Sequence, residues 1–149
     1  MEEKIIIWTV GHSNRSINAF VKILKEHGIQ VLVDVRSFPT SKVDHFKQEK
    51  MERWLLENGL EYVWLGEELG GYRNGGYERH MQTELFIKGV NRLLDIASKK
   101  RACIMCMETD PKYCHRRFIA SHLESKGLRV IHIIAKGQKI SRCSSKFKQ

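Results

Sequence analysis

Long apolar runs are absent from this chain of 149 residues, and we expect its start to be neither a signal peptide nor a membrane anchor. Its apolar start, residues 5–10, is far shorter than the roughly 20 residues of a membrane-spanning helix. That start also follows two glutamates, whereas a signal peptide opens with a basic segment. We therefore expect no membrane partner and a cytoplasmic location.

Linkers are missing as well. No stretch rich in proline or glycine divides the chain, which contains only two prolines. The length is that of one domain, and it suffices to bury a core without disulfide cross-links. We expect a single domain over residues 1–135, followed by a basic tail at residues 136–149.

Cysteine is scarce, with four residues at irregular spacing. Small secreted domains that depend on disulfides carry a denser cysteine framework. The sequence therefore predicts reduced thiols.

Acidic residues are outnumbered by basic ones, and the formal net charge is +9. Five basic residues and no acidic residue lie in the tail, so the rest of the chain carries +4. Such a tail is more typical of a solvated chain end than of a nucleic-acid reader. Net charge alone gives weak support to nucleic-acid binding.

Strand-like and helix-like segments alternate along the chain. Buried strands are predicted at residues 5–10, 28–36, 60–65, 102–105 and 128–134. Helical spacing follows each of the first four, and three of these helices stop at a glycine with an apolar residue directly after it. We predict an α/β fold, with an open, mostly parallel five-stranded sheet and helices on both faces, whose strand order stays open.

The segment at residues 66–82 has five glycines and no clear periodicity. A loop of this length inside a compact domain is usually functional or mobile. We expect it to close over a site, with Gly70, Gly71, Gly75 and Gly76 as hinges.

Reactive side chains follow the predicted strands at their carboxyl ends, where open α/β sheets bind ligands. In chain order they are His12, Ser13, Asp34, Arg36, Tyr72, Arg73, Cys106 and Glu108. The loops at the opposite edge are ordinary, so this asymmetry predicts one common site. A purely structural pair of Asp34 and Arg36 is an equal alternative to a direct ligand role.

Residues 106–117 concentrate the most reactive side chains of the chain. An apolar run precedes them, Asp110–Pro111 predicts a turn, and helical spacing follows. Cys114 is therefore expected near a helix N-terminus, where free backbone N–H groups lower the pKa of a thiol and attract anions.

The cysteines allow two other interpretations. Cys103 and Cys106 have the spacing of a metal or redox pair, but residues three apart on a strand point to opposite faces. A nucleophilic Cys106, as in phosphatases and sulfurtransferases, is disfavoured because the following loop contains two carboxylates and Lys112 in place of an arginine.

A metal site is a further alternative, built from Cys106, Glu108, Cys114 and His115. Our main hypothesis includes no metal, and the sequence indicates no particular cofactor. Oligomeric state is likewise not indicated.

Four motifs together resemble one known family. They are residues 9–13 (TVGHS), 32–39 (LVDVRSFP) and 69–71 (LGG), and Cys106-Met107-Glu108 followed by Cys114-His115-Arg116. In this combination the chain is similar to the domain of unknown function 488 (DUF488) family over about residues 5–134. The resemblance implies a single α/β domain and carries no reaction to transfer.

The leading hypothesis is a small enzyme of unknown reaction that acts on an anionic small molecule, a phosphate-bearing nucleotide or nucleic acid. His12 and Glu108 are acid/base candidates and Cys114 is the candidate nucleophile. Arg36, Arg73 and Arg116 are expected to clamp the anion. The remaining substrate-binding candidates are Ser13, Asp34, Tyr72 and His115.

The alternative hypothesis is a non-catalytic nucleic-acid-binding module. It would use the basic tail together with Tyr72, Arg73, Tyr77 and Arg79 of the glycine loop. Interleaved aromatic and basic side chains can stack on bases and contact phosphates. Ordinary packing of these tyrosines within the loop is the competing interpretation.

Overall fold

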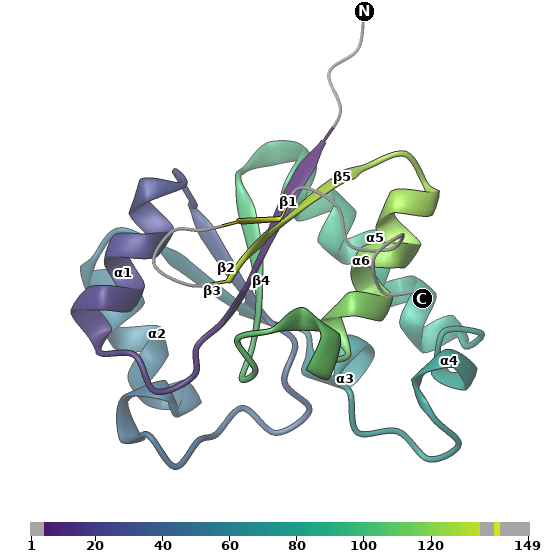
Figure 1. Cartoon of the computed structure of the whole chain (residues 1–149), viewed down its shortest axis with the longest axis horizontal. Coiled ribbons are helices and arrows are strands. Elements are labelled where there is room, and N and C mark those ends of the chain that lie inside the picture. Colours follow the sequence, from purple (N-terminus) through teal and green to yellow (C-terminus); the bar gives the residue numbers. More distant parts are fainter. Residues whose placement is uncertain (1–4, 135–138, 141–149) are drawn as a thin grey trace, which may run out of the picture.

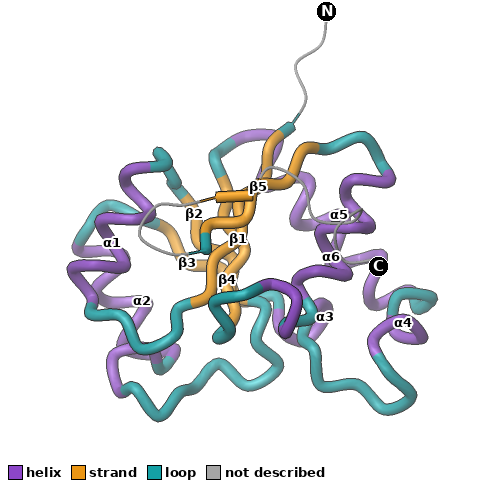
Figure 2. The backbone as a smooth tube through the Cα atoms, in the orientation of Figure 1, coloured by secondary structure: helices purple, strands orange, loops and turns teal. Residues whose placement is uncertain are grey.

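The computed structural model describes residues 5–134 and 139–140, and a sheet forms its centre (Figures 1 and 2). The strand order is β3-β2-β4-β1-β5-β6. Five strands run parallel: β1 (Ile6–Gly11), β2 (Val31–Asp34), β3 (Glu61–Trp64), β4 (Ala102–Cys106) and β5 (Arg129–Ile133). The predicted α/β fold is confirmed.

A sixth strand, β6 (Lys139–Ile140), pairs antiparallel with β5. The sequence did not predict it, because two residues carry no recognisable strand pattern. It falls in the segment expected to be a basic tail, and the rest of that tail lies outside the described residues.

Four long helices match the predicted ones: α1 (Ile17–Glu26), α2 (Gln48–Glu57), α5 (Glu84–Lys99) and α6 (Arg116–Ser125). The glycine loop contains two short helices that were not predicted, α3 (Gly66–Leu69) and α4 (Tyr77–His80). Single 3-10 turns, Asp44–Phe46 and Pro111–Tyr113, precede α2 and α6. None of the described helices has the length and apolarity needed to cross a membrane.

Side-chain caps fix where two of the long helices begin. The Ser16 hydroxyl accepts a hydrogen bond from the Ala19 N–H, and the Thr83 hydroxyl accepts one from the Phe86 N–H. Each cap satisfies a backbone donor that the helix cannot, which contributes about 1 kcal/mol.

The helices cover the two faces of the sheet as separate layers (Figure 1). On one face, α1 and α2 bury a core around Phe20, Phe46 and Trp54. On the other, α5 and α6 bury a second core around Phe86 and Leu123. Both faces of the parallel strands are therefore covered, which explains their continuous apolar sequence.

Strand order places β4 at the centre of the sheet, between β2 and β1. Ala102 pairs with Val31 on one side and with Ile7 on the other. The helix after β4 lies on the opposite face from the helices after β2 and β1 (Figure 1). Adjacent strands whose connections leave to opposite faces define the crevices where such sheets bind ligands. Both crevices flank the end of β4.

Gly11 ends β1 against the loop that follows β4. A Cβ atom at Gly11 would lie 1.8 Å from the Glu108 carbonyl oxygen, and a backbone group cannot move aside without distorting the loop. Gly59 has open space around it and a positive φ of 77°. The two glycines are therefore needed for different reasons.

We expect Gly11→Ala to lower the free energy of unfolding by about 3 kcal/mol or more, because the overlap is with backbone. Gly59→Ala should cost about 1 kcal/mol, the penalty of a left-handed backbone for an L-residue. Urea denaturation of the two variants measures both values. Equal losses would contradict the tight packing of β1 on the β4 loop.

Candidate functional site

Backbone hydrogen bonds bring the loops after three strands together at one edge. The His12 N–H donates to the Cys106 carbonyl at 2.8 Å, and the Ser13 N–H donates to the Met107 carbonyl at 2.9 Å. The Val35 N–H donates to the Met105 carbonyl at 3.0 Å. The end of β4 is thus bonded to the ends of both β1 and β2.

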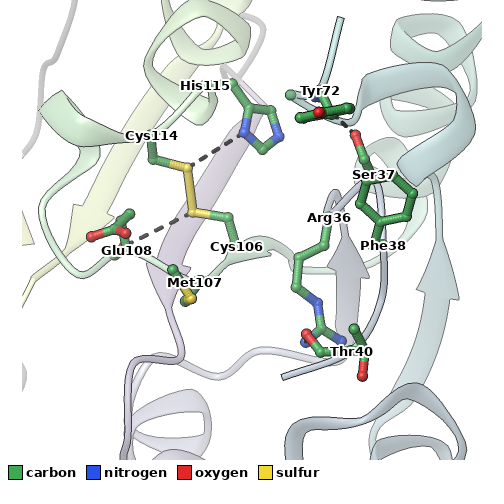
Figure 3. A pocket seen from close by; sticks show the side chains of 11 residues that line it. Arg36, Ser37, Phe38, Thr40, Tyr72, Cys106, Met107, Glu108, Cys114 and His115 are labelled. Carbon is green, nitrogen blue, oxygen red and sulfur yellow. Dashed lines mark hydrogen bonds between the residues drawn. A yellow bond between two sulfur atoms is a disulfide. The ribbon is translucent and has the colours of Figure 1, made fainter. Parts of the chain in front are cut away.

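A pocket of about 350 Å³ opens between the ends of β2 and β4 (Figure 3). Cys106, Cys114 and His115 lie along one side of it, and Phe38 and Tyr72 stand at another. Gly71 also lines the pocket. It lies so close to His115 that a Cβ atom at this position would be 2.5 Å from His115 Nδ1. The glycine loop therefore packs directly on this site.

Three large apolar side chains at the pocket are exposed to solvent. The exposed fractions are 65% for Phe38, 79% for Tyr72 and 53% for Met107. The rings of Phe38 and Tyr72 lie 5.6 Å apart, and the Tyr72 N–H donates to the Ser37 hydroxyl, which joins their two loops. Exposed aromatic groups beside a concave, partly apolar lining are typical of a binding surface.

The sulfurs of Cys106 and Cys114 form a disulfide at the pocket. The expectation of reduced thiols is therefore wrong for these two residues. The turn at Pro111–Tyr113 folds the chain back, so that the end of β4 meets the residue two positions before α6. A separation of eight residues in the sequence does not reveal this contact.

Cys103 lies apart from this pair. It is fully buried in the core beneath α1 and α2, whereas Cys106 belongs to the core on the other face. The prediction that the two residues point to opposite faces is confirmed. Burial raises the pKa of the Cys103 thiol, so this cysteine is unreactive.

His115 lies beside Cys114 in a defined tautomer. Its Nε2 is 2.8 Å from the Val35 carbonyl, which can only accept, so the proton resides on Nε2. Nδ1 then carries a lone pair, and it lies 3.7 Å from the Cys114 sulfur (Figure 3). Burial lowers the pKa of His115 to about 4, which keeps the imidazole neutral at pH 7.

Arg116 is a completely buried cation beneath the loop after β4. Its Nη1 donates to the Cys106 sulfur at 3.0 Å and to the Glu108 carbonyl at 2.6 Å, and its Nη2 donates to the Thr109 carbonyl at 2.7 Å. None of these partners is a carboxylate. Burial lowers the pKa of Arg116 to about 10, so the charge persists at neutral pH.

Arg36 and Asp34 form a buried ion pair. Nε and Nη2 of Arg36 donate to the two carboxylate oxygens of Asp34 at 2.9 and 2.7 Å. Nη1 donates to the Phe46 carbonyl at 2.7 Å, and the Tyr62 hydroxyl donates to Asp34 at 2.6 Å. Arg36 lines the pocket, but its donors are directed at the protein (Figure 3).

His12 is buried behind the pocket and does not line it. Its Nδ1 donates to the Ser13 carbonyl at 2.8 Å, and its ring stacks on Phe46 at 4.4 Å. Burial lowers the pKa of His12 to about 4. These contacts describe a neutral histidine fixed in the core, in contrast to the partly buried His115, which lines the pocket.

The remaining predicted residues divide between two places. Arg73 donates to the carbonyls of Gly70, Gly66 and Glu67, so it closes the C-terminal end of α3. Ser13 lines a second pocket, of about 620 Å³, in the crevice between β1 and β4. The exposed Glu108 borders both pockets.

Of the predicted site residues, the structure places five around the first pocket: Arg36, Tyr72, Glu108, Cys114 and His115. Phe38 was missing from the predicted residues, and Cys106 was predicted at this edge but was given no role outside the metal alternative. Phe38 could have been predicted as a site residue because it is an aromatic residue in the turn directly after a strand. For Cys106 the signal was its position at the end of a strand. A nucleophilic role was disfavoured because the loop that follows contains two carboxylates and Lys112.

Within residues 5–134 and 139–140, no group of three or more His, Cys, Asp or Glu side chains is arranged to hold a metal ion.

Fold and site together define a small α/β domain with a cysteine-containing pocket at the carboxyl ends of its central strands. The family model described as "Domain of unknown function DUF488" matches residues 16–123. The chain therefore belongs to the DUF488 family, although the match is shorter than the expected range. No curated protein and no solved structure shows a significant match to it.

Three buried histidines make the stability of the domain depend on pH. The pKa values of His12, His115 and His132 are lowered to about 4, in each case chiefly by burial. Between pH 6.5 and 4 the unfolded chain binds protons that the folded chain excludes. Stability therefore falls as the pH is lowered through this range, by about 1.4 kcal/mol per pH unit for each such histidine.

We expect His115→Gln, which keeps a donor for the Val35 carbonyl, to reduce this slope by about one proton. Unfolding by urea at several values between pH 5 and 6.5 measures the slope for parent and variant. Identical slopes would mean that the His115 imidazole titrates as it does in water.

Proposed function

We propose that this protein is a small cysteine-dependent enzyme that acts on an anionic, phosphate-bearing nucleotide. Cys114, in its reduced form, is the nucleophile. His115 is the base that takes its proton, because a Cys114 thiolate next to Nδ1 raises the pKa of the imidazole above the value of about 4 that it has beside the uncharged disulfide sulfur. The observation that carries the proposal is the contact between the Cys114 sulfur and the proton-free Nδ1 of His115 at the wall of an open pocket.

The arrangement follows the general pattern of an activated nucleophile. A base lies within reach of the thiol, and a third group, here the Val35 carbonyl, orients the base. The Arg116 backbone N–H also points at the Cys114 sulfur, at 3.5 Å. This N–H belongs to the first turn of α6, where partial positive charge stabilises a thiolate.

The charge of Arg116 supports an anionic substrate. Arg116 is fully buried and does not line the pocket, but its hydrogen bonds go to carbonyls and to the Cys106 sulfur, so its charge can stabilise an anion bound on the other side of Cys106. In the reduced protein the Cys106 thiolate is the nearest such anion, and a phosphate in the pocket adds another. By contrast, the charge of Arg36 is balanced by Asp34, so we assign the anion to the Arg116 side of the pocket.

The exposed aromatic pair supports a planar group in the substrate. Phe38 and Tyr72 come from two loops, contact each other edge to face, and are both exposed at the edge of the pocket. Stacking on a nucleobase contributes about 1–3 kcal/mol per base. A nucleotide combines such a ring with the negative charge that Arg116 favours.

The alternative, a nucleic-acid-binding module, has less support among the described residues. Tyr77 is buried and its hydroxyl donates to the Leu69 carbonyl. The guanidinium of Arg73 is directed at three carbonyls. Tyr72 and Arg79 remain exposed in this loop, and most of the basic tail lies outside the described residues.

Alkylation tests the nucleophile without knowledge of the substrate. In reduced protein, we expect iodoacetamide to modify Cys114 at pH 7 and to leave the buried Cys103 unmodified. His115→Gln should slow the modification of Cys114 about tenfold or more, because the thiol loses its base. Peptide mass spectrometry identifies the modified cysteine and its rate.

Cys103→Ala is the matched control and should leave that rate unchanged. Anionic iodoacetate provides the test of charge recognition. Its rate relative to iodoacetamide should be higher at Cys114 than at the thiol of free glutathione. An equal or lower ratio at Cys114 would contradict an anion-favouring pocket.

Thermal unfolding tests the substrate class. Nucleoside monophosphates should raise the Tm of the reduced protein more than the matching nucleosides do, because a ligand that binds only the folded state stabilises it. Phe38→Ala and Tyr72→Ala should weaken binding about tenfold each, through loss of stacking. No shift with any nucleotide at millimolar concentration would remove this substrate class.

A further inference from the structure

Cys106 and Cys114 come from different elements and meet at a pocket. Cys106 is the last residue of β4, and Cys114 precedes α6 by two residues. Their bonded sulfurs lie where a small molecule can enter, with Met107 and Glu108 beside them (Figure 3). A disulfide that serves only to strengthen a core needs no such access.

The surroundings of Cys106 stabilise its thiolate. The Arg116 guanidinium donates to this sulfur at 3.0 Å, and its other described partners are carbonyls. Reduction of the disulfide would create a negative charge beside a buried guanidinium whose other hydrogen-bond acceptors are uncharged carbonyls. Cys106 is therefore a good leaving group when another thiol attacks the disulfide.

The surroundings of Cys114 favour attack by and upon its sulfur. Cys114 is 8% exposed and Cys106 only 2%, so a small thiol or disulfide reaches Cys114 first. His115 Nδ1 and the Arg116 N–H contact the Cys114 sulfur from the protein side. One sulfur is thus accessible and close to a base, and the other is shielded and close to a cation.

We propose that Cys106 and Cys114 form a redox couple that exchanges electrons with low-molecular-weight disulfides. This activity goes beyond the proposed nucleotide chemistry and needs none of its substrate contacts. It has two steps.

In the first step, the Cys114 thiol gives its proton to His115, and the thiolate attacks one sulfur of the small disulfide. A mixed disulfide forms at Cys114, and one small thiolate leaves and takes up a proton. In the second step, the Cys106 thiol releases its proton to solvent, its thiolate attacks the Cys114 sulfur, and the second small thiolate leaves and takes up a proton from solvent. The protein loses two electrons and becomes the disulfide, and the small disulfide becomes two thiols.

The oxidised state also removes the nucleophile of the proposed enzyme. While Cys114 is bonded to Cys106, its sulfur cannot form the thiolate that attacks a nucleotide. The same couple would therefore switch that chemistry off under oxidising conditions and restore it when small thiols reduce the bond.

The test is equilibration of the native protein with mixtures of reduced and oxidised glutathione. After acid quenching and alkylation, mass spectrometry counts the free cysteines and assigns them to peptides. We expect the pair at residues 106 and 114 to change between dithiol and disulfide reversibly within the range of these mixtures. A pair that stays oxidised in excess reduced glutathione, or never forms in excess oxidised glutathione, overturns the proposal.

Single-cysteine variants test the order of the steps. Cys106→Ser should accumulate a glutathione mixed disulfide at Cys114, because the resolving thiol is gone. Cys114→Ser should form the glutathione mixed disulfide at Cys106 about tenfold more slowly, or more slowly still, because the Cys106 sulfur is shielded. Cys103→Ala, at a buried cysteine outside the pair, should behave as the parent chain does. The reverse order of rates in the two serine variants would contradict the assigned roles.

Arg116→Lys provides a second measurement. With the guanidinium contact to Cys106 weakened, the ratio of reduced to oxidised glutathione at half-reduction should rise about tenfold. An unchanged ratio in folded variant protein would show that Arg116 does not stabilise the thiolate. All these readouts omit nucleotides, so failure of the proposed enzyme activity leaves them interpretable, and the converse also holds.

Discussion

The site depends above all on one buried positive charge. The guanidinium of Arg116 holds the Glu108 and Thr109 carbonyls and the Cys106 sulfur around itself, and thereby fixes the course of the loop after β4. Burying an ion in a low-dielectric interior is costly unless its hydrogen bonds are made. The loop therefore has little freedom to rearrange. These hydrogen bonds of Arg116 thereby fix the positions of the pocket wall, of both cysteines and of the start of α6.

A second buried charge supports the other wall. Arg36 is held by Asp34, and through the Thr40 and Phe46 carbonyls it fixes the segment after β2. Two arginines that the sequence suggested as anion clamps thus act first as scaffolding for two loops. This division leaves the thiols, His115 and the exposed aromatic rings as the parts of the pocket that can meet a ligand.

Local patterns accounted for much of the fold. Apolar runs and helical spacing located five strands and four long helices, because burial on a sheet face or helix side imposes a period on the sequence. Strand order could not be obtained this way, since it depends on contacts such as that of Ala102 with both Ile7 and Val31. The same limit applied to the site. The direction of the strands was enough to predict that the site residues lie at one edge of the sheet. The bond between Cys106 and Cys114 depends on how the loops fold back. So do the hydrogen bonds that Arg36 and Arg116 donate to the protein.

The central position of β4 also has a consequence for how the chain acquires its structure. β1 and β2 are not hydrogen-bonded to each other; each pairs with β4, which lies some 70 residues or more further along the chain. During synthesis β1 and β2, which are apolar on both faces, cannot pair with β4 until residues 102–106 have left the ribosome. Such long-range pairing slows folding and prolongs the exposure of unpaired, aggregation-prone strand edges. The segment that completes the sheet is also the one that delivers Cys106, so the pocket can form only as the sheet does.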